Sequence, residues 1–62
     1  MKFHICLYKD GYEVININFV IQINWYGNFI QIFTEYQPDE FAGGFIFDFD
    51  EFDYFEVDKI ND

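Results

Sequence analysis

One stretch, from Tyr12 to Trp25, constrains the fold more than any other part of the sequence. Apart from Glu13, its odd positions are large and apolar, and most of its even positions are Asn or Gln, with Val14 and Val20 as exceptions. Successive side chains of a strand point to opposite faces, so this period of two predicts a strand with one apolar face. At about 3.4 Å per residue it would span roughly 45 Å, so we expect it to coil or bulge near Asn18.

Both neighbours of this strand are predicted from turn signals. Residues 2–8 alternate in the same phase, and a three-residue loop at 9–11 would pair Ile5 with Ile15, so that the two apolar faces coincide. Residues 27–28, Gly then Asn, favour a two-residue type II′ turn into a third strand over 29–36. The long strand should therefore lie between two partners.

The second half is predicted to add a short helical turn and a fourth strand. Proline and two acidic residues open the turn at 37–42, and two glycines end it. Alternating phenylalanines then predict a strand from Phe45 to Phe49, whose phase breaks at residues 50–51. We favour a strand to about Val57. The rival is a helix over residues 51–60, although its apolar residues do not form a stripe.

These elements predict a mainly β fold: a small antiparallel meander of about four strands with one short helical turn, in a single domain spanning 1–62. A helix at 51–60 would make the fold α+β. The expected apolar face comprises Phe3, Ile5, Ile15, Ile17, Phe19, Ile21, Ile23, Trp25, Ile30 and Ile32. So short a chain covers this face poorly, and leftover apolar surface predicts a homodimer or a fold that coils tightly.

Charge is distributed unevenly along the chain. Residues 35–62 carry ten of the twelve acidic residues and one of the three lysines, so the whole net charge of −9 lies there. Such a field repels nucleic acid and attracts basic surfaces. Direct nucleic-acid binding is therefore not expected. No long apolar run predicts a membrane span, and one cysteine fits a reducing compartment, so we expect a complete cytoplasmic protein.

Residues that could perform chemistry are scarce. His4 and Cys6 share a strand face, but one histidine and one cysteine cannot complete a zinc site or an obvious catalytic set, and the sequence has no serine. The acids after Asp48 do not place glycine and oxygen ligands as a calcium-binding EF-hand loop does. We therefore predict a protein that is not an enzyme, with no catalytic residues, no metal site and no cofactor.

The acidic segment remains as the candidate partner-binding site. Acids beside aromatic strands often only keep a sheet soluble and discourage edge pairing. Here, however, the acids alternate with aromatic residues, and a row spaced about 7 Å apart resembles the charges of a nucleic-acid backbone. The predicted partner-binding residues are Asp48, Asp50, Glu51, Phe52, Asp53, Tyr54, Glu56 and Asp58.

The functional hypothesis follows from the small size of the chain, its acidic charge and its lack of an evident catalytic or metal-binding set. The sequence suggests an inhibitor that occupies the basic groove of a host nucleic-acid-binding defence enzyme, as anti-CRISPR and antirestriction proteins do by DNA mimicry. Richness in Phe, Ile, Asn, Tyr and Asp suggests an AT-rich genome and a phage origin, which would place the protein in the host cytoplasm. The alternatives are a structural, self-assembling β module and an immunity protein against a basic toxin nuclease.

Overall fold

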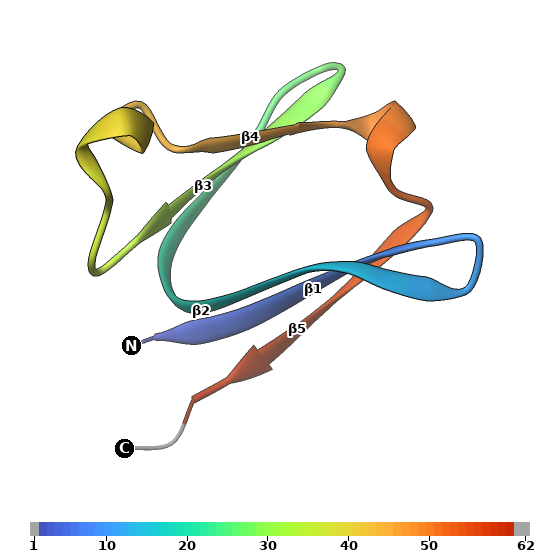
Figure 1. Cartoon of the computed structure of the whole chain (residues 1–62), viewed down its shortest axis with the longest axis horizontal. Coiled ribbons are helices and arrows are strands. Elements are labelled where there is room, and N and C mark those ends of the chain that lie inside the picture. The colour runs from blue at the N-terminus through green and yellow to red at the C-terminus, as the bar shows by residue number, and fades with distance from the viewer. Residues whose placement is uncertain (1, 61–62) are drawn as a thin grey trace.

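The computed structural model describes residues 2–60, which form one open sheet of five antiparallel strands (Figure 1). The order across the sheet is β4-β3-β2-β1-β5. The strands are β1 (Phe3–Lys9), β2 (Tyr12–Trp25), β3 (Phe29–Thr34), β4 (Phe45–Asp48) and β5 (Tyr54–Lys59), and two 3-10 turns are η1 (Asp39–Phe41) and η2 (Phe49–Glu51). The predicted antiparallel β fold with a short helical turn is confirmed.

The last segment is a strand, so the alternative of a helix over residues 51–60 is wrong. The phase break at residues 50–51 is the turn η2, and the chain then returns beside β1 instead of extending β4. Phe55 and Val57 are the partners of Leu7 and Ile5 across this pairing. Only an extended strand places apolar residues two apart on the same face as those core residues.

The long strand β2 bends sharply between two halves, as Figure 1 shows. A straight strand of 14 residues at about 3.4 Å each would exceed the 30 Å longest dimension of the molecule. The register shifts on both sides of Val20, and Phe19 has a positive φ of 59°. The predicted irregularity near Asn18 is therefore confirmed, and it lies at the bend between the two halves of β2.

The bend reverses the expected inside and outside of β2 at residues 19–21, while Ile15, Ile17 and Ile23 pack against the core as predicted. Val20, an exception to the apolar alternation, is fully buried, whereas Phe19 and Ile21 are 41% and 53% exposed. Bulges next to Val20 add unpaired residues, so one even-numbered side chain faces the core between odd-numbered neighbours. Trp25, at the end of the strand, is also half exposed. The prediction that Phe19 and Ile21 belong to the apolar face that packs in the core was wrong, whereas Trp25 lies on that face beside Ile30.

The first hairpin has a shorter loop than predicted. Lys9 is the partner of Tyr12, which leaves a two-residue loop in which Asp10 and Gly11 both have positive φ, 54° and 82°. Two such residues are the requirement of a type I′ turn. A register shift at Val14 then restores the parity, and Ile15 pairs with Leu7 instead of Ile5. The apolar faces coincide as predicted, but through a bulge and not through a longer loop.

The second hairpin has the predicted register near its turn. Trp25 pairs with Ile30 and Ile23 with Ile32, as expected. Gly27 lacks the positive φ that a type II′ turn needs, so the predicted turn type is wrong. Farther from the turn, the bulge in β2 makes Val20, and not Ile21, the partner of Thr34.

The connection from β3 to β4 packs closely onto the sheet. Pro38 precedes η1 in an extended conformation, and the turn ends before Gly44, which has a φ of 92°. A Cβ atom on Gly44 would lie 2.8 Å from Cγ of Gln31 and 3.2 Å from Cζ of Phe33. Glycine is needed here for both its backbone conformation and its size.

The core lies inside the curled sheet. One layer consists of β5, β1 and the first half of β2, and the other consists of the second half of β2 with β3 and β4 (Figure 1). The buried cluster between them comprises Ile5, Leu7, Val20, Ile30, Ile32 and Phe52. Within residues 2–60 no helix has the length and apolar character needed to cross a membrane.

Candidate interaction surface

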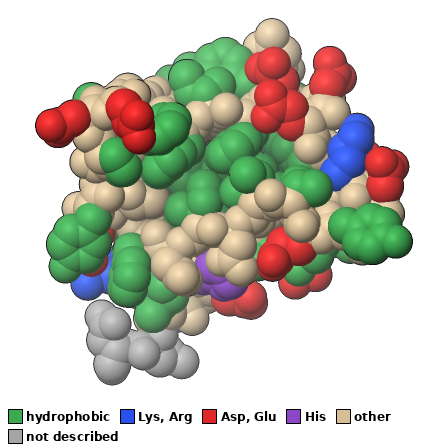
Figure 2. Space-filling view, in the orientation of Figure 1, with side chains coloured by type: hydrophobic (Ala, Val, Ile, Leu, Met, Phe, Trp, Pro, Cys, Tyr) green, Lys and Arg blue, Asp and Glu red, His purple; other side chains and the backbone are tan. Residues whose placement is uncertain are grey.

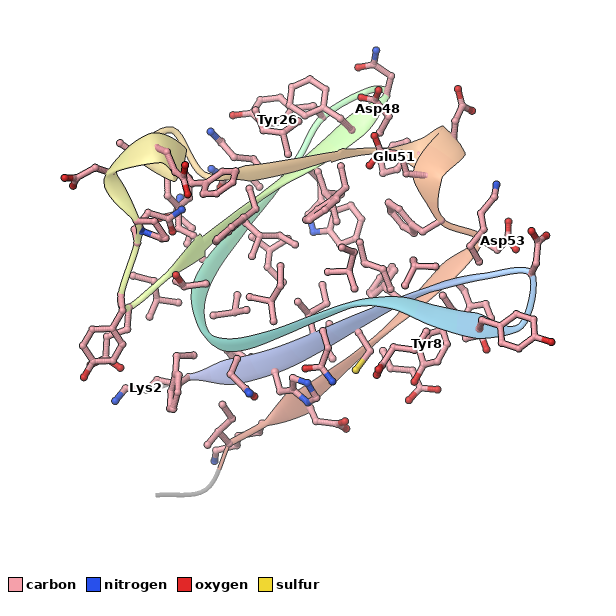
Figure 3. All side chains as sticks on the ribbon, in the orientation of Figure 1. Lys2, Tyr8, Tyr26, Asp48, Glu51 and Asp53 are labelled. Atoms are coloured by element: carbon pink, nitrogen blue, oxygen red, sulfur yellow. The ribbon has the colours of Figure 1, made fainter. Side chains whose placement is uncertain are left out.

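The eight residues predicted to bind a partner fall into three groups. Four carboxylates gather before and around η2, and we call them the acidic turn: Asp48, Asp50, Glu51 and Asp53. Three side chains point outward from β5, and we call them the outer row: Tyr54, Glu56 and Asp58. Phe52 lies in the core with 8% of its surface exposed, so it is not available as an anchor. Figure 3 shows the positions of Asp48, Glu51 and Asp53 along the chain.

The acidic turn is fastened to the first hairpin through Asp53. Its Oδ2 accepts a hydrogen bond of 2.8 Å from the backbone N–H of Asp10, and its Oδ1 lies 3.8 Å from Nζ of Lys9. Nζ of Lys9 also donates to the carbonyl oxygen of Asp50 at 2.9 Å. Among the described residues, the carboxylates of Asp48, Asp50 and Glu51 have no lysine partner, and all three residues are exposed. Most of the charge of the turn therefore faces solvent.

The outer row continues across β1. Tyr54, Glu56 and Asp58 are the partners of Tyr8, Cys6 and His4. The Tyr8 and Tyr54 rings stack, with centroids 4.7 Å apart and planes within 7°. Burial and the nearby Glu56 carboxylate raise the pKa of Tyr8. The Tyr8 hydroxyl therefore holds its proton more tightly beside the acids.

His4 and Cys6 are close together but are not arranged for nucleophilic catalysis. Nε2 of His4 lies 3.6 Å from Sγ of Cys6 and also contacts Oδ1 of Asn16. The amide of Asn16 is oriented by its own donation of 3.2 Å to Oε1 of Glu13. An amide oxygen only accepts, so Nε2 carries the proton and cannot remove one from the thiol.

The electrostatic surroundings of Cys6 also favour the thiol. Burial, together with the hydrogen bond and negative charge of Glu13, raises the pKa of Cys6. A thiol in such surroundings is a poor nucleophile and a poor metal ligand. Across residues 2–60, no three His, Cys, Asp or Glu side chains are grouped so that they could hold a metal ion.

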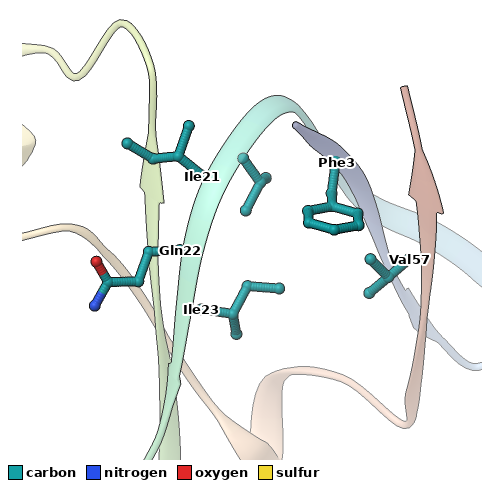
Figure 4. A pocket seen from close by; sticks show the side chains of 6 residues that line it. Phe3, Ile21, Gln22, Ile23 and Val57 are labelled. Atoms are coloured by element: carbon teal, nitrogen blue, oxygen red, sulfur yellow. The ribbon is translucent and has the colours of Figure 1, made fainter. Parts of the chain in front are cut away.

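Sequence reasoning missed an apolar groove between β2 and β5. It has a volume of about 270 Å³ and is lined by Phe3, Val20, Ile21, Gln22, Ile23 and Val57. Figure 4 shows Phe3, Ile23 and Val57 pointing into the space between the two strands. These residues come together only because β2 bends and the sheet curls. No local pattern in the sequence predicts that.

A second, aromatic hollow lies at the other end of β5, next to the acidic turn. It has a volume of about 360 Å³ and is lined by Trp25, Phe49, Phe52, Asp53, Tyr54 and Phe55. The Trp25 ring centroid is 5.1 Å from that of Phe55 and 6.4 Å from that of Phe49. Figure 2 shows apolar side chains in the middle of this face, with acidic side chains around its margin.

Comparisons of the chain with protein-family models, with curated protein sequences and with solved structures find no match. The surface is therefore interpreted from its own geometry and charge.

Proposed function

We propose that this protein is a small acidic, non-enzymatic inhibitor that binds the basic groove of a nucleic-acid-binding defence enzyme of a phage host. One observation carries the proposal: the acidic turn borders the exposed aromatic hollow through Asp53 and leads directly into the outer row, which lies on the other face of β5. The partner would meet negative charge at the margin and apolar surface in the middle.

The electrostatics of this surface suit such a partner. With a net charge of −9, the chain attracts a positively charged groove and repels free nucleic acid. Complementary charge accelerates encounter, while aromatic side chains near the centre of an interface supply much of the affinity. Trp25 and Tyr54, 52% and 48% exposed, are the candidate anchors.

The mimicry that we propose rests on a cluster of carboxylates and not on a continuous row. Glu56 and Asp58 occupy alternate strand positions about 7 Å apart, whereas the acidic turn presents its charges on a compact loop. A groove that binds phosphates would therefore contact the acidic turn and the outer row at two separate points. Both contacts should weaken with salt.

Affinity capture from lysate of a candidate host, eluted over a salt gradient, tests the proposal. We expect one basic nucleic-acid-binding protein, released by moderate salt and displaced by DNA. The double variant Asp48→Asn/Glu51→Gln should slow association with that protein by roughly threefold to tenfold. The control Asp39→Asn/Glu40→Gln removes the same charge at η1, where it should have little effect. Equal slowing in both variants would refute a localised acidic site.

A self-assembling β module is the second candidate, because in the described part of the chain both edge strands of the sheet, β4 and β5, lack a neighbouring strand on one side. Exposed sheet edges and exposed apolar side chains both promote association between copies. This function predicts a stable oligomer of fixed size and no partner whose binding depends on salt. Sedimentation of the purified protein at micromolar concentration measures this, and a monomer at all concentrations would contradict it.

A further inference from the structure

The edge strand β5 has free hydrogen-bonding groups along one side. Among residues 2–60 it pairs only with β1 and stands at the end of the sheet. Ile60 donates to the carbonyl oxygen of Lys2, which fixes the alternation of the antiparallel ladder. The backbone groups of Tyr54, Glu56 and Asp58 therefore face β1, while those of Phe55, Val57 and Lys59 point away from the sheet.

The two faces of β5 differ in chemistry. Glu56 and Asp58 lie on the outer face, whereas Phe55 and Val57 lie on the face that borders the apolar groove. Every residue of β5 is exposed. A strand added at this edge would place its side chains opposite these residues, alternately beside carboxylates and beside apolar groups.

The size of the groove favours side chains over a small-molecule ligand. Its volume of about 270 Å³ lies below the roughly 300–1,000 Å³ typical of sites for small molecules. Its walls are almost entirely apolar, and Gln22 has the one polar side chain among the residues that line it. Aliphatic side chains from an adjacent strand would fill it without leaving a polar group unpaired.

We infer that β5 binds an extended segment of its partner in which basic and apolar residues alternate, adding a sixth strand to the sheet. This inference rests on the proposed function, because the segment would belong to the basic partner. Lys or Arg at two alternate positions would lie opposite Glu56 and Asp58. Apolar residues between them would enter the groove beside Val57. The free backbone groups of Phe55, Val57 and Lys59 would bond to the added strand.

Charge opposes the other simple occupant of this edge, which is β5 of a second copy. In an antiparallel pair related by a two-fold axis, residues of the same face lie opposite each other. Every register that overlaps most of the two strands would set Glu56 opposite Glu56 or opposite Asp58. Like charges directly opposite are destabilising, so the same acids that favour a basic segment disfavour self-pairing.

Synthetic peptides provide a direct test. The probe is a seven-residue peptide of alternating Lys and Val, and the control has the same composition with its lysines consecutive. Hydrogen exchange of the intact protein is measured by NMR with each peptide. We expect only the alternating peptide to slow exchange at Phe55, Val57 and Lys59, while the amides of Glu56 and Asp58 are already protected by β1. Equal effects of both peptides would show attraction by charge alone and overturn the inference.

Two variants separate the contributions of charge and backbone. Glu56→Gln/Asp58→Asn should lower the affinity for the alternating peptide about tenfold or more relative to the control Asp39→Asn/Glu40→Gln. Val57→Pro removes one free N–H at an edge position where proline is tolerated, so it should fold and lose binding. Should this variant not fold, peptides N-methylated at alternate residues test the same bonds from the other side, and undiminished binding refutes the added strand.

The outcomes also separate this inference from the proposed function. If a captured basic partner binds Val57→Pro as tightly as it binds the unchanged protein, the added strand is refuted while the proposed inhibitor function still holds. An alternating peptide that binds at β5, with no nucleic-acid-binding partner recovered, would retain the strand-binding edge and refute the inhibitor.

Discussion

Val20 provides the sharpest test of how β2 is built. The apolar alternation of the sequence places Val20 outward, but the structure buries it completely where the strand bends. Val20→Thr keeps the shape and the β-branched side chain but brings a hydroxyl into the core. A buried hydroxyl without a partner costs about 1–3 kcal/mol. A domain of 62 residues has a free energy of unfolding of roughly 3–9 kcal/mol, so the loss should be large.

The control is the same substitution on the same strand. Val14→Thr changes a residue that is 48% exposed at the first bulge, and we expect its effect to stay within about 0.5 kcal/mol. Urea unfolding followed by tryptophan fluorescence of Trp25 gives both free energies. If Val20→Thr and Val14→Thr are equally stable, the residue at position 20 faces solvent and the two bulges that turn it inward are refuted.

Other predictions address the turn, the core and the thiol. Gly44→Ala should lower the free energy of unfolding by about 2–4 kcal/mol, since it adds a close contact to an unfavourable φ, whereas Gly43→Ala meets no atom within 4 Å and should be nearly neutral in the same urea assay. Phe52→Ala should cost about 3–5 kcal/mol and Phe49→Ala, at a 38% exposed site, clearly less, as thermal unfolding would show; equal losses would contradict the placement of Phe52 in the core. The raised pKa of the Cys6 thiol means that the folded state holds this proton more tightly than the unfolded chain does. The stabilisation from this difference should be complete below the ordinary thiol pKa of about 8.5 and should be lost as pH rises through the pKa of the folded state. The free energy of unfolding of Cys6→Ala should therefore fall less above about pH 8.5 than that of the unchanged protein. An equal fall in the two proteins would refute the raised pKa.

The sequence predicted β1, β2 and β3 well because each of them carries its own periodicity, whereas the favoured single strand from Phe45 to about Val57 is two strands, β4 and β5, separated by η2. Period-two alternation identifies β1 and β3, and a glycine in each connecting loop, Gly11 and Gly27, indicates the two hairpins. The details that failed depend on contacts between distant segments. The register predicted for the first hairpin was correct in parity but not in pairing, because a bulge lies at Val14. The register predicted for the second hairpin was correct only from the turn to the bulge next to Val20. No feature of the strand itself separates a bulge residue from its neighbours.

The candidate surface was predictable in its charge but not in its shape. Composition alone located the acids in the second half of the chain. The division into the acidic turn and the outer row required knowing that β5 returns beside β1, and Phe52 entered the core because η2 turns the chain inward. The apolar groove joins Phe3, Ile23 and Val57 from three strands, so it exists only after the sheet has curled.

Displacement of DNA from the captured partner tests directly whether the acidic surface occupies the nucleic-acid groove. Labelled DNA bound to that protein is titrated with the acidic protein at several salt concentrations. Our account predicts stoichiometric release that weakens as salt rises, is impaired by Asp48→Asn/Glu51→Gln and is unchanged by Asp39→Asn/Glu40→Gln. A partner that keeps its DNA at saturating protein, or release that both double variants reduce equally, would contradict an acidic surface that occupies the nucleic-acid groove.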